Sequence, residues 1–140
     1  ESLSLAAALA TIKKIRKEKV CQSLKKKGLF LNNAIENLIK KHKLSKVISL
    51  CGHPSWKILI FKDFRNITKE AIKTFVLKEM IARGVFIVAG HNISFSHSKE
   101  DLKLVIKAYD ETFLKLAHTM KKNDQNLFFK PFIEPIFKVR

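Results

Sequence analysis

A chain of 140 residues, of which 46% are hydrophobic, is long enough for one domain with a core and too short for a clear division into two. Its 28 Lys and Arg outnumber its 12 Asp and Glu, so the formal net charge is +16. No apolar run reaches the roughly 18 residues of a membrane-spanning helix, and Glu1 opens no charged-then-apolar leader, so we expect a soluble chain without a membrane partner. Two thiols, Cys21 and Cys51, in a long Lys-rich chain fit a reducing cytoplasm rather than a disulfide-rich secreted scaffold.

The N-terminal third of the chain predicts two helices. Residues 3–15, "LSLAAALATIKKI", contain no Gly or Pro and space their leucines and isoleucines for a helical face, so this helix is expected to be largely buried. A second helix is predicted from Glu18 to about His42, because its apolar residues recur on one face and a helix tolerates Gly28 in its middle.

The middle of the chain predicts an antiparallel strand pair and a third helix. The β-rich runs "KVISLCG" and "WKILIFKD" are separated by "GHPS", where Gly52 and Pro54 favour a turn. Thr68 is suited to cap the helix that follows, and Gly84 ends that helix.

The last third predicts further strands, a helix and a tail. The segments "VFIVA" and "NISFS" predict two strands or one bent strand, and Ser98 to Asp101 form a capping box that opens a fourth helix. Residues 120–140 predict a polar loop and an extended, Pro-punctuated tail whose phenylalanines must cover something. The whole order is typical of an α+β fold, with helices packed on a small antiparallel sheet.

The positive charge is nearly all lysine. The chain has only four arginines, whereas base and phosphate recognition favours the planar fork of Arg, and its lysines are spread over every segment. A generic basic surface, without specific nucleic-acid recognition, is therefore the preferred interpretation. If a polyanion does bind, the densest run, Lys25–Lys27, is the first place to look.

Metal and nucleophile sites are not favoured. Zinc would need Cys51, His53, His91 and His97, but the chain has no C-x-x-C pair, and His91 and His97 would lie about 20 Å apart in a straight strand. No third group is evident to orient Cys51 and His53 as a catalytic pair, so Cys51 is expected to be packed in the structure. Trp56 is expected in the core, or alternatively in contact with an absent domain.

A short polar stretch separates the "VFIVA" run from the last helix. It contains His91, Asn92, Ser94, Ser96, His97 and Ser98. One interpretation is a turn and sheet end whose side chains satisfy the backbone, and the other is contact with a substrate. The residues themselves leave both open.

Four segments, in this order, carry a resemblance: "LSLAAALATIKKI", "MIARGVFI", "SFSHSKEDLKLVIKAYDETF" and "PIFKVR". Together they resemble the C-terminal small domain of class III, fold-type I pyridoxal-phosphate aminotransferases, in the glutamate-1-semialdehyde aminomutase-like branch. The resemblance implies that residues 1–140 form a single small domain. Residues 1–17 would then be the opening helix that links it to a cofactor domain absent from this sequence.

The same resemblance implies that the cofactor chemistry lies outside this sequence. In the family, the Schiff-base lysine, the aspartate on the pyridine nitrogen and the phosphate contacts all belong to segments upstream of the position of Glu1. This chain is accordingly expected to hold no catalytic or cofactor-binding residue, to bind no cofactor and to be inactive alone. The full-length parent is expected to use pyridoxal phosphate, to form a homodimer built mostly by the upstream domain, and to act on small-molecule amino donors and acceptors.

The implied role of the small domain is to close over the cofactor and help to hold the substrate. In glutamate-1-semialdehyde aminomutases the loop after the strand that corresponds to "GVFIVA" is longer and carries a glutamate. In this chain the corresponding loop, "AGHNIS", is shorter and has no acid. The resemblance therefore implies a different amino-group transfer, for example on a sugar or another metabolite. His91 and Asn92 would occupy the substrate-facing position, with Ser94, His53 and Ser55 as further contacts. Neither His91 nor Asn92 adds to an apolar stripe, so substituting either is predicted to leave the thermal midpoint nearly unchanged.

The alternative is a stand-alone basic module, with the same fold, that binds nucleic acid or another polyanion. An open reading frame that continues upstream into a lysine-bearing cofactor domain would decide for the enzyme.

Overall fold

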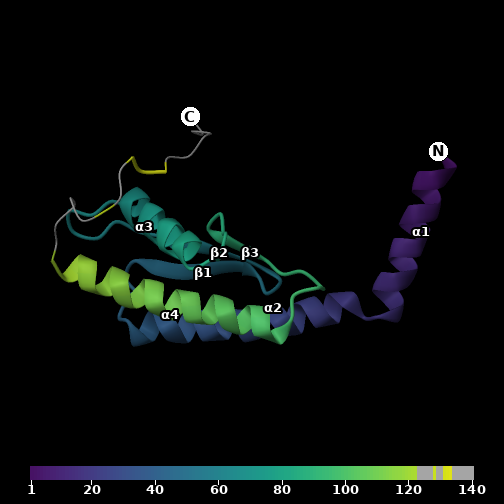
Figure 1. Ribbon diagram of the computed structural model, residues 1–140, viewed down its shortest axis with the longest axis horizontal. Coiled ribbons are helices and arrows are strands. Elements are labelled where there is room, and N and C mark those ends of the chain that lie inside the picture. Colours follow the sequence, from purple (N-terminus) through teal and green to yellow (C-terminus); the bar gives the residue numbers. More distant parts are fainter. Residues whose placement is uncertain (123–127, 129–130, 134–140) are drawn as a thin grey trace.

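The described part of the chain folds into three strands and four helices (Figure 1). The structure is a computed structural model, and it describes residues 1–122, 128 and 131–133. The elements in chain order are α1 (Ser2–Lys17), α2 (Val20–Lys41), β1 (Ile48–His53), β2 (Trp56–Phe61), α3 (Lys69–Ala82), β3 (Gly90–Asn92) and α4 (Lys99–Lys121). The predicted α+β class, with helices on a small antiparallel sheet, is confirmed.

The sheet has the order β1-β2-β3, and both neighbouring pairs are antiparallel. The predicted β1–β2 pair is therefore confirmed. Because side chains alternate along a strand, Leu59 faces the helices while Ile58 and Ile60 face the other way. Leu59 is 3% exposed, but Ile58 and Ile60 are 41% and 40% exposed. We call the surface made by Trp56, Ile58 and Ile60 the open face.

The expected strand over "VFIVA" is absent. Only Gly90–Asn92 pairs with β2, although residues 85–89 still alternate, with Val85 and Ile87 buried and Phe86 and Val88 exposed. Ala89 has a φ of 61°, and its carbonyl accepts a single hydrogen bond from the Leu59 amide at 2.8 Å. This kink explains the difference, because a left-handed residue interrupts the ladder between the alternating run and β3.

The core lies between the helices and the sheet. Helices α2 and α3 contact the sheet, and α4 packs against both of them. Tyr109 and Phe113 of α4 are fully buried, with their rings 5.2 Å apart. Both predicted helix caps are confirmed: Thr68 Oγ1 accepts from the Ala71 amide, and Ser98 and Asp101 form a complete capping box.

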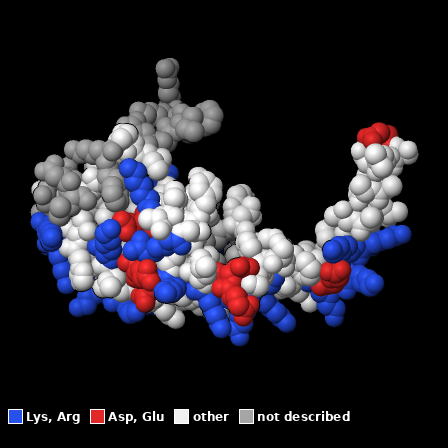
Figure 2. All heavy atoms as spheres, viewed as in Figure 1, with Lys and Arg blue, Asp and Glu red and all other residues white. Residues whose placement is uncertain are grey.

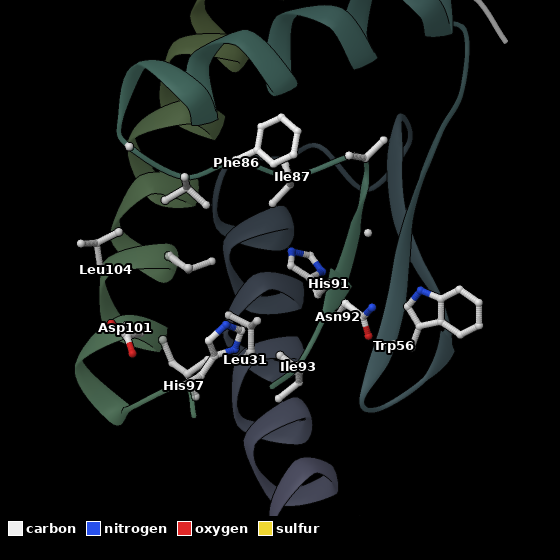
Figure 3. A pocket seen from close by; sticks show the side chains of 16 residues that line it. Leu31, Trp56, Phe86, Ile87, His91, Asn92, Ile93, His97, Asp101 and Leu104 are labelled. Carbon is white, nitrogen blue, oxygen red and sulfur yellow. The ribbon is translucent and has the colours of Figure 1, made fainter. Parts of the chain in front are cut away.

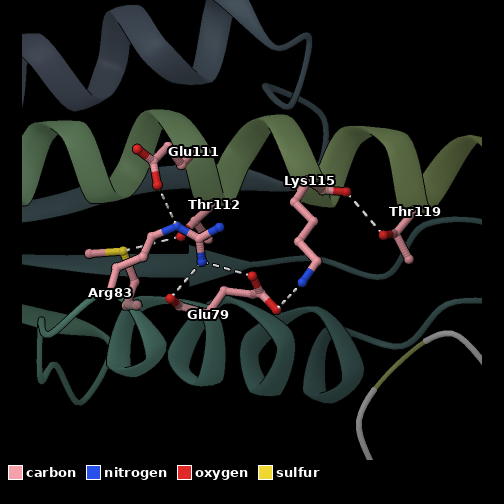
Figure 4. A network of polar contacts seen from close by, with 7 residues as sticks. Glu79, Arg83, Glu111, Thr112, Lys115 and Thr119 are labelled. Carbon is pink, nitrogen blue, oxygen red and sulfur yellow. Dashed lines mark hydrogen bonds and ion pairs between the residues drawn. The ribbon is translucent and has the colours of Figure 1, made fainter.

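A buried carboxylate joins α3 to α4 (Figure 4). Glu79 accepts hydrogen bonds from Arg83 Nη1 at 2.8 Å and from Lys115 Nζ at 2.7 Å, and Arg83 Nε also donates to Glu111 at 3.0 Å. Burial alone would raise the pKa of Glu79, but the hydrogen bonds and charges of Lys115 and Arg83 outweigh it and hold that pKa below its usual value. The network fixes the end of α3, where the exposed loop at Phe86 begins.

Gly28 is required rather than merely tolerated in α2. A Cβ on this residue would lie 2.1 Å from the Pro54 carbonyl oxygen, so the β1–β2 turn could not approach the helix. One turn of helix later, Asn32 Nδ2 donates to the same oxygen at 2.8 Å. The two residues together dock the turn onto α2.

Three predictions of burial are wrong. No residue of α1 is buried, and the helix extends away from the rest of the chain (Figure 1). Trp56 is 62% exposed, and the thiol residue Cys51 is exposed as well. An apolar pattern shows that a surface avoids water but not what covers it, and no described residue covers these three.

The start of the C-terminal tail does cover the core. Phe128 is buried and stacks at a tilt on Phe75, with the ring centroids 5.5 Å apart, and the Ile133 amide donates to Thr74 Oγ1. The rest of the predicted loop and tail lies outside the described residues. Within the described ranges, no helix is long and apolar enough to cross a bilayer.

Candidate functional site

The β1–β2 turn and β3 bring four of the five predicted site residues to one end of the sheet. In the strand register His53 is opposite Trp56, and Trp56 is opposite Asn92. The Ile93 amide donates to the Ser55 carbonyl at 3.1 Å, which places Ser55 and Ser94 beside the same edge. His53 and Asn92 are exposed, and Ser55 and Ser94 are partly exposed.

The fifth residue, His91, points the opposite way, into the core. Its side chain is 5% exposed, and its Nε2 lies 2.6 Å from the hydroxyl oxygen of Tyr109. Burial lowers the pKa of His91 to about 4 and raises the pKa of Tyr109, so both groups are neutral near pH 7. Either Nε2 or the tyrosine hydroxyl is the donor in this hydrogen bond, depending on the tautomer, and Nδ1 has no partner among the described residues.

Several polar side chains of the predicted stretch satisfy the backbone. His53 Nδ1 accepts from the Ser55 amide, and His97 Nδ1 accepts from the Ser94 amide, both at 3.2 Å. Lys27 Nζ, from the densest lysine run, donates to the Phe95 and His97 carbonyls at 2.6 and 2.7 Å. The contact of His97 fits the turn-and-sheet-end interpretation of residues 91–98, and His53, outside that stretch, has a similar contact with the backbone, but neither gives the Asn92 side chain a backbone role.

A pocket of about 720 Å³ opens beside β3, between the loop after α3 and the first turns of α4 (Figure 3). Its walls are mainly apolar, and its polar members are His91, Asn92, His97 and Asp101. Hydrogen bonds from the backbone and hydroxyl of Ser98 lower the pKa of Asp101, so the one acid in the lining is held ionised by its capping role.

The pocket does not fit pyridoxal phosphate as its own cofactor site. No lysine or arginine is among the described residues that line it, so this chain offers neither a cofactor lysine nor a cation for the phosphate there. No catalytic step through the cofactor is therefore assigned to these residues. Nor do any three His, Cys, Asp or Glu side chains of the described residues group as metal ligands.

Two features of the site were not predicted from the sequence. The Tyr109 contact with His91 links residues 18 positions apart, and the Asn32 contact with Pro54 links residues 22 positions apart. Neither spacing is a known local motif. The one available signal was weak: a polar residue, Asn32, on the apolar face of α2.

Comparison with known proteins finds both similar sequences and similar structures. No family profile matches this sequence. A glutamate-1-semialdehyde 2,1-aminomutase from Ruminiclostridium cellulolyticum is 25% identical over an alignment of 130 residues, and the match covers 86% of this chain and 30% of that protein. This chain thus spans less than a third of the length of the curated relative it matches.

The structural likenesses are also to parts of longer chains. The FumI protein of Sphingopyxis sp. MTA144, solved in its pyridoxal-phosphate internal aldimine form, matches with a TM-score of 0.70 and 21% identity over 83% of this chain and 27% of its own. An omega-transaminase from Sphaerobacter thermophilus matches with a TM-score of 0.63 and 16% identity over 80% of this chain and 27% of its own. The predicted resemblance is confirmed: the chain is similar in sequence and fold to the C-terminal small domain of pyridoxal-phosphate aminotransferases.

Proposed function

We propose that this chain is the C-terminal small domain of a pyridoxal-phosphate-dependent aminotransferase or aminomutase-like enzyme, and that it closes the active site and contributes substrate contacts. The observation that carries the proposal is the 25% identity to an aminomutase over 130 residues, together with the match to only 30% of that protein. A larger domain of the parent would supply the cofactor lysine. We further propose a homodimeric parent in the cytoplasm that acts on small-molecule amino donors and acceptors.

The open face supports docking of that larger domain. Trp56, Ile58 and Ile60 form an apolar row along β2, and Phe86 and Val88, 80% and 73% exposed, come from the loop beside the same strand. A contiguous apolar patch of this kind on a chain with a net charge of +16 marks a surface that another protein surface covers. The apolar residues of α1 would be covered in the same assembly.

Asn92, His53, Ser55 and Ser94 then lie at the border of the docked surface. All four carry hydrogen-bonding groups at the end of the sheet, next to the exposed ring of Trp56. Closure of the domain would remove water from them, and hydrogen bonds to a substrate gain strength in a dry site. Asn92 is the residue we assign to substrate contact first, because it is exposed and lies opposite Trp56 in the strand register.

His91 has a different proposed role, as a positioning residue. Its hydrogen bond to Tyr109 ties β3 to α4, and this fixes the strand that presents Asn92 on the opposite side. Because His91 is buried and bonded, the prediction that its replacement leaves the thermal midpoint unchanged is revised. We expect His91→Ala to lower both the midpoint and kcat/KM, and Asn92→Ala to lower kcat/KM alone, by roughly ten- to a hundredfold.

The test begins with the gene. We expect the reading frame to continue upstream of Glu1 into a lysine-bearing domain, and the longer protein to transfer amino groups between a donor and a keto acid. The 140-residue chain with added pyridoxal phosphate is expected to show no turnover. A natural chain that starts near Glu1, or sustained turnover by this chain alone, would contradict the proposal.

A further inference from the structure

The basic residues of this chain are not all spread evenly over solvated faces. A second hollow, of about 490 Å³, lies at the end of the molecule away from α1, where α2 and α4 both end. The first α4 residue that lines this second hollow is Leu114, and the last α4 residue that lines the pocket beside His91 is Val105. About 13 Å of helix therefore separates the two cavities. We call this second hollow the basic hollow.

Basic side chains converge on the basic hollow from four separate segments, and Figure 2 shows Lys and Arg side chains at this end of the molecule. The lining includes Lys41, His42 and Lys43 at the end of α2, Lys46 before β1, Arg65 after β2, and His118 and Lys121 at the end of α4. No Asp or Glu is among the described residues that line it. Outside the lining, Asp110 Oδ1 accepts a hydrogen bond from Lys41 Nζ at 2.9 Å and lies 2.6 Å from His42 Nε2. This one nearby acid neutralises part of the positive charge.

Two of these cations stand in a conformation that ordinary side chains avoid. Lys43 follows the C-terminus of α2 with a φ of 60°, where Gly or Asn is the usual residue. Arg65 has a φ of 54° at the first central position of a two-residue turn, closed by hydrogen bonds between Phe64 and Ile67, where Gly is favoured. Lys43 and Arg65 thus each place a basic side chain at the hollow where glycine would be favoured.

The floor of the basic hollow is apolar. It consists of Leu44, Val47, Phe64, Leu114, Ala117 and Met120. The four cations at its rim, Lys43, Lys46, Arg65 and Lys121, are exposed and can therefore be reached by an anion from solvent. Arg65 also lies over the Phe64 ring at 5.3 Å, which holds its guanidinium at the rim.

From these observations we propose that the basic hollow binds a small polyphosphorylated anion, through Lys43, Lys46, Arg65 and Lys121. The site is separate from the proposed active-site surface and does not depend on it. It also differs from the sequence-based expectation, because the densest lysine run is elsewhere and Lys27 of that run is engaged by loop carbonyls.

The chain offers a matched control for the test. Lys19 is also a lysine at positive φ, 49°, but it stands at the corner between α1 and α2, outside the basic hollow. Lys43→Gly and Lys19→Gly thus remove the same charge from the same backbone conformation. Neither is expected to lower the thermal midpoint, since glycine accepts this conformation without strain.

Binding of inorganic triphosphate to the 140-residue chain should be measured by calorimetry at about 0.15 M salt, with the thermal midpoint of each variant recorded alongside. We expect saturable binding at one site. Lys43→Gly and Arg65→Gly should each weaken it by roughly tenfold, whereas Lys19→Gly should change it by less than about twofold.

Three results would overturn the proposal. The first is the absence of saturable triphosphate binding by the unsubstituted chain. The second is an equal loss of triphosphate affinity in Lys43→Gly and Lys19→Gly. A single-stranded oligonucleotide that binds more tightly than triphosphate, with an affinity that both variants lower equally, would count in the same way, because either result would show a diffuse polyelectrolyte effect. The third is a lower midpoint for Lys43→Gly with unchanged triphosphate affinity, which would mean that Lys43 serves the C-terminus of α2.

Discussion

Leu59 and Ile58 are neighbours on the same strand, both are aliphatic, and they differ more than tenfold in exposure: Leu59 is 3% exposed and Ile58 is 41% exposed. One side chain faces the helices and the other faces the open side. A strand that is apolar on both sides is typical of a sheet covered on both sides. The described residues cover only one, so the "WKILIF" run predicts a covering surface that the described residues do not supply.

The first way to test this comparison is to truncate each neighbour in turn. We expect Leu59→Ala to destabilise the chain by about 2–5 kcal/mol, because it leaves a cavity in the core, and Ile58→Ala by less than about 1 kcal/mol. Chemical denaturation of the two variants measures both values. Similar losses would mean that the open face is already covered within this chain.

The covered side also includes the docked β1–β2 turn. Gly28→Ala would improve the helix propensity of α2 by about 1 kcal/mol, but the new methyl group would meet the Pro54 carbonyl oxygen. We expect a net loss of about 1–3 kcal/mol in the free energy of unfolding. Leu29→Ala, one position along at an exposed site, serves as the control and should be nearly neutral. A stabilising Gly28→Ala would show that the turn is not held against α2.

The predicted and unpredicted parts of the structure divide by how local their signals are. The capping box at Ser98, the cap at Thr68 and the β1–β2 turn rest on residues within a few positions of each other, and all are confirmed. The left-handed conformation of Ala89 has no such local signal, because alanine rarely adopts it. The prediction of a strand over residues 85–89 was therefore wrong.

The candidate site was predicted only in part, for a related reason. The strand register that gathers His53 and Asn92 follows from the turn and was within reach of sequence reasoning. The inward direction of His91 depends on β3 pairing with β2 and on Tyr109, which is brought near by the packing of α4. The predicted burial of α1 was wrong, because an apolar helical pattern does not say whether any other part of the chain covers it.

The buried His91, on the covered side of β3, should make the free energy of unfolding depend on pH. Burial lowers the pKa of folded His91 to about 4, below its unfolded value of roughly 6.5, so its contribution to stability is complete above pH 6.5 and is lost as the pH falls toward 4. Between pH 7 and pH 5 the free energy of unfolding should fall by about 2 kcal/mol from this group. In His91→Phe that part of the loss should disappear, whereas His118→Gln, at an exposed position, should retain it. The same pH dependence in His91→Phe would show that His91 is not the group responsible.

The central claim is that a second protein surface covers the open face, and Ile58→Lys tests it most directly in two settings. In the 140-residue chain the lysine remains in water, and the free energy of unfolding should change by no more than about 1 kcal/mol. In the full-length enzyme the same lysine would be buried without a partner, so amino transfer should be lost or the small domain should unfold separately at several kcal/mol lower stability. If Ile58→Lys leaves both the activity and the stability of the full-length enzyme intact, the open face is not the interface and the proposed docking is wrong.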